Sequence, residues 1–245
     1  VQLKILKHYV LKKDLSLMKD FSLTTRVLKA LQLQPFQILL LLRESIYLLK
    51  NNKILLASSN LGKISEFKKI FDCFEPISQE ELGIDDAIED GISFFENALK
   101  KARHGSKKSN LFTIADDSGL VVPELDYAPG IYSARYAGEG ASDKDNRDKI
   151  IAELNRKNVS SLDAFYVCVL VGVRSYSDPI PLYSIGEIHG KISIRSSGDG
   201  GFGYDKIFYP NGYSVSMASI DAEEKNRISH RGIAAKSFIK ELEKL

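Results

Sequence analysis

The feature that most constrains the fold of this chain is an alternation, from Lys53 onward, of short β-branched runs with segments of helical periodicity. Such an alternation is typical of an α/β domain, in which helices cover a sheet. Residues 53–58 and 111–115 are predicted to be short strands, and residues 165–173 a longer one. Because no internal repeat and no Pro- or Ser-rich linker interrupts this part, we expect one domain over residues 53–245.

The starts of two helices are marked by side chains that can cap them. Ser93 and Glu96 have the spacing of a capping box, so a helix is predicted from there to about residue 107. Ser142 and Asp145 repeat this signal. Two further helices, one after the first strand and one at the C-terminus, are expected from the spacing of Ile64, Phe67, Ile70 and Phe71 and of Ala234, Phe238 and Leu242.

Residues 1–52 differ in character, because they are rich in Leu and Lys and contain no Gly. We predict a separate helical or poorly ordered extension there. Three explanations compete: an accessory helical segment, a basic targeting peptide, and translated sequence upstream of the true start. The acidic residues Asp14, Asp20 and Glu44 disfavour a targeting peptide, which usually lacks them.

Charge and cysteine content limit the partners. The 34 basic residues nearly balance the 32 acidic ones, so no global field favours nucleic acid or anionic lipid, and we expect neither as a partner. The most apolar stretch, residues 30–42, is too short and too polar to span a membrane. Cys73 and Cys168 are far apart and lie in no metal-binding pattern, which favours a reducing, cytoplasmic location.

The first segment that could carry chemistry is the polar turn between the first strand and its helix. Free N–H groups and the positive end of a helix can hold phosphate at such a turn, and a lysine adds charge. The turn is not a Walker A loop, since Ala57 and Ile64 stand where that motif needs Gly and Ser or Thr. Taken alone, it is more typical of an ordinary capped connection. Its residues are Ser58, Ser59, Asn60, Leu61, Gly62 and Lys63.

Two adjacent carboxylates, Asp116 and Asp117, are predicted to follow the end of the strand at residues 111–115. Successive strand residues point to opposite faces, so one carboxylate should face a site while the other braces the loop. A carboxylate at such a place suits Mg²⁺ or a water that needs a base. The alternative is a solvated Asp-Asp-Ser-Gly turn.

The segment Gly198–Gly203 matches the pattern G-x-G-x-x-G of dinucleotide-binding loops. That interpretation fails because the pattern requires a helix directly afterwards, whereas residues 204–210 are expected to be extended. The glycines instead permit close approach of the backbone to a flat ligand, with Phe202 and Tyr204 for stacking and Asp205 for hydrogen bonding. A glycine-rich hairpin turn is the alternative.

Cations concentrate just before the C-terminal helix. Lys225 can neutralise phosphate, and His230 and Arg231 can donate hydrogen bonds to a base carbonyl or a phosphate. By default such a run is a solvated helix entrance.

Together these segments resemble one family, the inosine triphosphate pyrophosphatases of the Ham1 type. The resemblance covers about residue 53 to the end. It rests on six motifs in order: Ser59-Asn60-x-Gly62-Lys63, Ser93-Phe94-x-Glu96-Asn97-Ala98, Ala115-Asp116-Asp117-Ser118-Gly119-Leu120, Ala128-Pro129-Gly130-Ile131-Tyr132-Ser133-Ala134-Arg135-Tyr136, Gly200-Gly201-Phe202-Gly203-Tyr204-Asp205, and Lys225-x-x-x-Ser229-His230-Arg231.

The resemblance implies an α/β fold with an elongated mixed sheet, two lobes around a central cleft, a homodimer and a requirement for Mg²⁺. It implies an enzyme that hydrolyses ITP, dITP and XTP to the monophosphate and pyrophosphate, cleansing the nucleotide pool. A non-catalytic nucleotide-binding protein is the competing class, and the intact pair Asp116 and Asp117 argues against it.

The resemblance also implies roles for residues of this chain. By this resemblance, Asp117 corresponds to the family residue that accepts a proton and binds magnesium, and Glu89 corresponds to a second magnesium ligand. The substrate contacts implied are Ser58, Ser59, Asn60, Leu61, Gly62, Lys63, Ser118, Phe202, Gly203, Tyr204, Asp205, Lys225, His230 and Arg231. Two departures stand out: Ser58-Ser59 occupies the place of a common Thr-Gly pair, and residues 1–52 have no counterpart.

Overall fold

The computed structural model describes residues 53–71 and 74–244, and the predictions made for residues 1–52 and Cys73 lie outside them. A six-stranded sheet of order β2-β1-β3-β4-β5-β6 forms the centre. β1 pairs in parallel with β2 and β3, and the remaining pairs are antiparallel, which confirms the mixed α/β sheet. The strands are β1 (Lys53–Leu56), β2 (Glu75–Ser78), β3 (Phe112–Val121), β4 (Ser161–Val173), β5 (Leu182–Ser193) and β6 (Phe208–Pro210).

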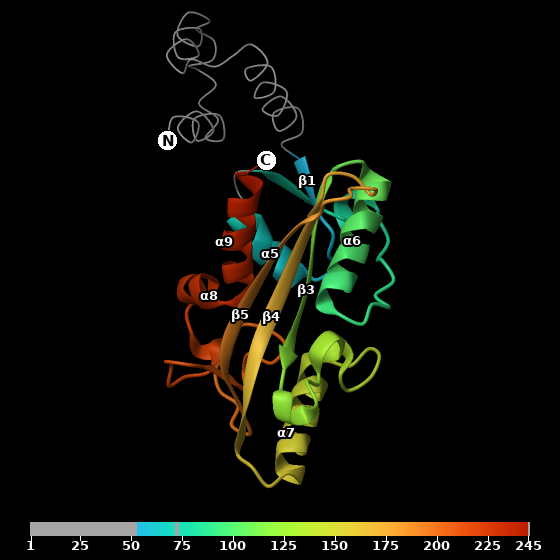
Figure 1. Ribbon diagram of the computed structural model, residues 1–245. Helices are drawn as coiled ribbons and strands as arrows, with labels where there is room; N and C mark the ends of the chain where they lie inside the picture. Colours follow the sequence, from blue (N-terminus) through green and yellow to red (C-terminus); the bar gives the residue numbers. More distant parts are fainter. Residues whose placement is uncertain (1–52, 72–73, 245) are drawn as a thin grey trace, which may run out of the picture.

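Five α-helices flank the sheet over the described residues (Figure 1). They are α5 (Leu61–Ile70), α6 (Phe94–Ser109), α7 (Asp143–Arg156), α8 (Ala222–Ile228) and α9 (His230–Leu242), with 3₁₀ turns η1 (Glu80–Leu82), η2 (Pro123–Leu125), η3 (Gly130–Arg135) and η4 (Met217–Ser219). The long strands β3, β4 and β5 run along the long axis of the described domain, with α6 beside their upper part and α7 near its lower end in Figure 1. The domain is therefore elongated.

Strand β4 shows why the sheet is buried on both faces. Its residues Cys168 and Leu170 pack with Phe238 of α9, whereas Val169 and Val171 pack on the α6 side of the sheet with small residues such as Ala98 and Ala102. Side chains of successive strand residues point to opposite faces. A strand covered by a helix on each face has no solvent side, so an uninterrupted apolar run fits it.

The predicted capping signals act as caps, with one difference. At α7 the capping box is complete: Ser142 accepts from the backbone N–H of Asp145, and Asp145 accepts from that of Ser142. At α6, Ser93 accepts from the Glu96 N–H, but Glu96 accepts from the N–H of Ile92 rather than that of Ser93. Glu96 therefore accepts from the N–H of the residue before the N-cap, whereas in the standard capping box it would accept from the N–H of the N-cap itself.

The prediction that Asp116 and Asp117 follow the end of a strand is wrong. β3 continues through both residues to Val121, because its pairing with β4 extends over residues 113–121. Each carboxylate is tolerated inside the strand because a lysine from a flanking helix meets it: Lys63 for Asp116 and Lys101 for Asp117. The prediction that the two side chains occupy opposite faces is confirmed.

The glycine-rich segment leads into no helix, which confirms the rejection of a dinucleotide-binding loop. The expectation of an extended stretch over residues 204–210 is only partly correct. Turns occupy residues 204–207, and the strand β6 is limited to residues 208–210. Asp205 bends the chain there, since its carboxylate accepts from the Phe202 N–H at 3.1 Å.

Among the described helices, none is long and apolar enough to cross a membrane.

Candidate active site

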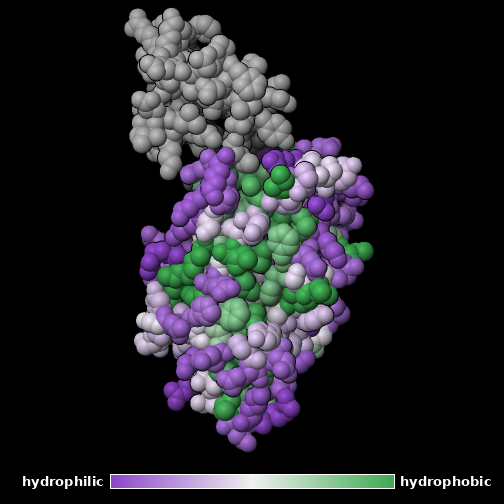
Figure 2. Space-filling model, in the orientation of Figure 1, coloured by the Kyte–Doolittle hydropathy of each residue, from purple (hydrophilic) through white to green (hydrophobic). Residues whose placement is uncertain are grey.

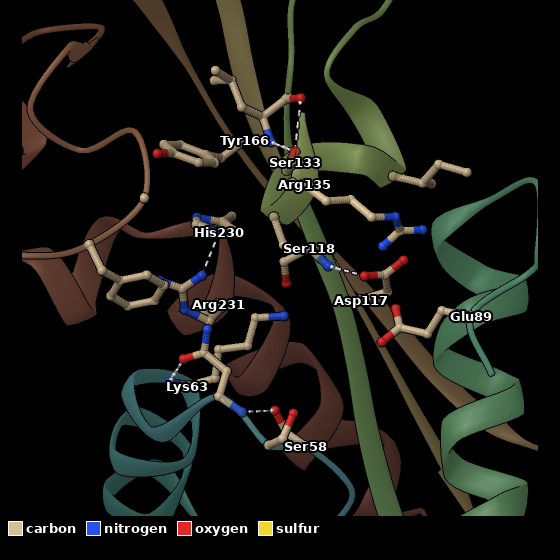
Figure 3. A pocket seen from close by; sticks show the side chains of 18 of the residues that line it. Ser58, Lys63, Glu89, Asp117, Ser118, Ser133, Arg135, Tyr166, His230 and Arg231 are labelled. Atoms are coloured by element: carbon tan, nitrogen blue, oxygen red, sulfur yellow. Dashed lines mark hydrogen bonds between the residues drawn. The ribbon is translucent and has the colours of Figure 1, made fainter. Parts of the chain in front are cut away.

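A cavity of about 360 Å³ opens beside β3, beyond the end of β1. β1 pairs with β3 along residues 112–114, and among the described residues the rest of β3 has no strand partner on that side apart from one bridge at Val121. The cavity occupies this edge, where ligands of α/β sheets commonly bind. Figure 3 shows Asp117 and Glu89 on one side of β3 and Lys63, His230 and Arg231 on the other.

Most predicted site residues line this cavity. They are Ser58, Ser59, Asn60, Lys63, Glu89, Asp117, Ser118, Phe202, Gly203, Tyr204, Asp205, His230 and Arg231. Three do not: Leu61, which is 70% exposed, and Gly62 and Lys225. Gly62 still matters to the wall, because a Cβ there would lie 3.1 Å from Cε1 of Phe202.

The turn after β1 is organised by Asn60. Its side chain caps α5 by accepting from the Lys63 N–H at 3.0 Å, while the Asn60 N–H donates to Ser58 Oγ at 3.2 Å. The N-terminus of α5, the positive end of its dipole, is thereby fixed at the cavity wall. Lys63 extends from the first turn and its ammonium lies 2.7 Å from Asp116 Oδ2.

Asp116 lies beneath the cavity and is ionised at neutral pH. It is 2% exposed, and burial alone would favour its neutral form. That effect is outweighed by Lys63 and Lys101, so the pKa of Asp116 is lowered to about 2. The Ser118 hydroxyl donates to the same carboxylate at 2.7 Å. Asp116 thus holds Lys63 and Ser118 in place rather than facing the cavity.

The side chain of Asp117 points toward α6, on the other face of the sheet from Lys63. Its Oδ2 accepts from Asn97 Nδ2 at 3.2 Å, and its Oδ1 lies 3.7 Å from the Lys101 ammonium. Burial raises the pKa of Asp117, and the nearby lysines offset this only in part. The Lys101 ammonium also lies 3.2 Å from Glu89 Oε2. Two carboxylates therefore direct oxygens toward one cation.

This donor set fits Mg²⁺. Mg²⁺ usually takes one or two protein carboxylates and completes its shell with waters and substrate phosphates. Glu89 and Asp117 supply those carboxylates, and the ammonium of Lys101 already marks a position of matching charge between them. In the described part of the chain no group of three or more His, Cys, Asp or Glu side chains could form a cage, so waters and substrate phosphates would complete the shell.

The opposite end of the cavity carries an aromatic wall. The guanidinium of Arg231 lies 4.7 Å from the ring centroid of Phe202, and the Lys225 ammonium lies 5.3 Å from it. Lys225 is 8% exposed and lies behind the loop, where it donates to Asp205 Oδ2 at 2.8 Å and lies 3.8 Å from Glu66. Its charge is therefore engaged by two carboxylates.

His230 is a neutral donor in this wall. Burial, with the charge of Arg231, places the pKa of His230 well below its usual value. Arg231 can only donate, so its contact of 2.9 Å makes His230 Nε2 the acceptor and leaves the proton on Nδ1. Within the described residues Nδ1 has no hydrogen-bond partner. The ring stacks on Tyr166 at 4.6 Å, which fixes its plane.

Several residues of the site escaped the sequence-based prediction. Lys101 stands four residues after Asn97 on α6, a spacing that places both on one helix face. This spacing could have indicated that Lys101 lies near the site. Glu66, which pairs with Arg231, stands three residues after Lys63 and offered a similar signal. Arg135 of η3 also lines the cavity, and its only ion pair among the described residues is with the exposed Glu139.

Comparison with known proteins identifies a family and relatives that this chain resembles. Residues 54–241 match the sequence model of the Ham1 family. A dITP/XTP pyrophosphatase of Acinetobacter baumannii (strain ACICU) is 48% identical over 197 residues, which is 78% of this chain and 95% of that protein. One from Legionella pneumophila (strain Paris) is 46% identical over 182 residues, covering 74% of this chain and 94% of that protein.

Solved structures show the same fold. A HAM1 protein from Coxiella burnetii superposes with a TM-score of 0.73 at 38% identity, covering 79% of this chain and 99% of that one. The Ham1 protein of Staphylococcus aureus gives a TM-score of 0.70 at 39% identity, covering 78% of this chain and 98% of that one.

Proposed function

Because this chain belongs to the Ham1 family, we propose that it is a hydrolase of nucleotide metabolism that converts ITP, dITP and XTP to the monophosphate and pyrophosphate. One observation carries the proposal: a single cavity joins an acidic end, built on Asp117 and Glu89, to an aromatic end with fixed hydrogen-bond donors. The first end suits a triphosphate with its metal, and the second suits a purine base.

At the phosphate end, Lys63 and the N-terminus of α5 bind phosphate oxygens. Mg²⁺, held by Glu89 and Asp117, would supply positive charge against the triphosphate and the departing pyrophosphate. Asp117 accepts the proton of the attacking water, and its raised pKa suits a base that has to take up a proton. Lys101 neutralises the carboxylates until substrate and metal bind.

At the base end of the cavity, we expect the hydrogen-bond donors of the wall to select the purine base. A 6-oxo purine offers an acceptor to the Arg231 guanidinium, and to the buried His230 Nδ1–H once a movement of the wall uncovers it, whereas the 6-amino group of adenine presents hydrogens to them. A site built to bond one group rejects an analogue that leaves its buried polar atoms unpaired. Phe202 contributes a stacking face for the base.

The test is a comparison of pyrophosphate release from a panel of nucleotides with Mg²⁺. We expect turnover of ITP, dITP and XTP with far poorer turnover of ATP and GTP, and loss of activity when a chelator removes the metal. Guanine shares the 6-oxo group with hypoxanthine, so poor turnover of GTP would additionally reveal a contact that rejects its 2-amino group. Equal rates with ATP and ITP would refute the proposed base selectivity.

We assign this activity to a domain of residues 53–245, supported by the family match over residues 54–241. A cytoplasmic location is in keeping with the buried free thiol of Cys168, whose pKa burial raises to about 12, and with the nucleotide substrates. The near-balance of charge in the whole chain gives no support to a nucleic-acid partner.

We further propose a homodimer through the face formed by α6 and β5. Figure 2 shows apolar side chains gathered in the middle of this face. Phe95 of α6 meets Tyr183 of β5 edge to face at 5.6 Å, and both rings remain exposed beside Ile185. Exposed apolar patches of this kind commonly mark interfaces.

Sedimentation at micromolar concentration should show a dimer that Tyr183→Asp dissociates. Tyr132 is equally exposed, at 56%, and lies on η3 rather than on α6 or β5, so Tyr132→Asp serves as the control. A monomeric parent chain, or a Tyr183→Asp variant that remains dimeric, would contradict this assignment.

A further inference from the structure

Two side chains of α7 hold both polar groups of one residue in the cavity wall. Arg147 Nη1 donates to the Gly203 carbonyl oxygen at 2.6 Å, and the Gly203 N–H donates to Asp143 Oδ2 at 2.6 Å. Asp143 and Arg147 are four residues apart, so they lie one turn apart on the same face of the helix. Both contacts involve an ionised side chain, which makes them stronger than bonds between neutral groups.

Gly203 depends on this pair. Its φ of +61° lies in the left-handed region, within a loop that has no strand or helix. Across the residues that the structure describes, Gly203 makes no backbone hydrogen bond. The other side of the loop is tied through Asp205, which accepts from Lys225 and from Tyr166. Without α7, Gly203 would lose the only hydrogen-bond partners that its backbone has among the described residues.

The same helix also holds the facing part of the cavity wall. Asn146 donates to the Ala134 carbonyl at 3.1 Å and accepts from the Ala137 N–H at 2.8 Å. Ala134 and Gly203 both line the cavity. α7 is anchored in the core by Ile150 and Leu154, which are completely buried. The first turns of α7 thus connect η3 with the loop around Gly203, two parts of the cavity wall.

We propose that Asp143 and Arg147 are positioning residues that orient the Gly203 peptide, and through it Phe202 and Asp205, for the purine base. Phe202 precedes Gly203 directly, so a rotation of the Gly203 peptide would turn the ring relative to Arg231, 4.7 Å away. The pair therefore governs base affinity and selectivity, not the chemical step. This inference rests on the proposed function.

The helix supplies its own control. Lys144 and Asp148 form an ion pair at 2.5 Å with the same spacing of four residues, but their side chains are 75% and 53% exposed. This pair contacts neither loop in the described structure. Substitution of Lys144 therefore removes a charged side chain from the same turn of α7, and its ion pair lies outside the contacts that hold Gly203.

Steady-state kinetics of the full chain with dITP, dATP and Mg²⁺ tests the proposal. Arg147→Ala should raise the KM for dITP about 10-fold or more, because a hydrogen bond from a charged group is lost, while kcat changes less than about threefold. The ratio of kcat/KM for dITP to that for dATP should fall. Arg147→Lys, which keeps one charged donor, should recover part of the affinity, and Lys144→Ala should resemble the parent chain.

Asp143→Ala provides a second variant if Arg147→Ala folds poorly, and it should raise KM in the same way. A fall in kcat with an unchanged KM would indicate fewer folded molecules and would overturn the positioning role. So would a KM effect equal to that of Lys144→Ala. Failure of the parent chain to hydrolyse dITP would instead refute the proposed function, so the two failures are distinguishable.

Discussion

Asp117→Asn is expected to lower kcat for dITP by about 10³-fold, within the range seen when a proton acceptor is removed. The amide keeps the shape of the side chain but removes the charge that a metal and an attacking water require. The contact with Asn97 Nδ2 at 3.2 Å can be kept through the amide oxygen, so the fold should remain intact. Measurement of dITP hydrolysis and thermal unfolding on the same preparation separates the two effects.

The neighbouring carboxylate is the control. Asp116 pairs with Lys63 at 2.7 Å on the other face of β3 and does not line the cavity. Asp116→Asn should therefore cost stability, because it leaves Lys63 without its buried partner, and should lower kcat less than Asp117→Asn does. If the two variants exchanged these outcomes, the assignment of faces to roles would be reversed. An Asp117→Asn protein with substantial activity would refute its catalytic role.

Lys225→Met is expected to lower the free energy of unfolding by about 3–5 kcal/mol, the typical cost of breaking a buried ion pair from one side. Lys225 is 8% exposed and donates to Asp205 Oδ2 at 2.8 Å, with Glu66 3.8 Å away. Methionine fills a similar volume but leaves the Asp205 carboxylate buried without its cation. Urea unfolding at neutral pH measures the change.

A matched ion pair lies on the same helix. Arg227 and Glu224 form an ion pair at 2.5 Å, but the Arg227 side chain is 64% exposed and screened by water. Arg227→Met should therefore change the unfolding midpoint little. Equal destabilisation by the two substitutions would mean that burial of Lys225 does not account for its importance. A negligible effect of Lys225→Met would mean that the contacts of Lys225 with Asp205 and Glu66 do not stabilise the fold.

Local features of the fold could be predicted from the sequence because their causes are local. The cap of α7 depends on Ser142 and Asp145, three residues apart, and both of its reciprocal bonds form. The rejection of a dinucleotide-binding loop at Gly198–Gly203 needed only the absence of a following helix. The opposite faces of Asp116 and Asp117 followed from strand alternation alone.

Long-range pairing could not be predicted in this way. Strand β3 continues through Asp117 because β4, some 50 residues later in the chain, pairs with it up to Val121. Lys225 was expected to neutralise a triphosphate, yet the fold places two carboxylates against it, one of them Glu66 from a distant helix. Spacing along the sequence shows which charged residues lie near one another in the chain. It does not show which of them the fold will pair with an opposite charge from a distant segment.

The identity of the products is the most direct test of the account. Phosphorus NMR of dITP incubated with the full chain and Mg²⁺ should show the deoxynucleoside monophosphate and pyrophosphate appearing together in equal amounts, with no diphosphate intermediate. Appearance of a nucleoside diphosphate with inorganic phosphate, or no reaction while dITP still binds, would contradict the assignment of this cavity as a pyrophosphate-releasing active site.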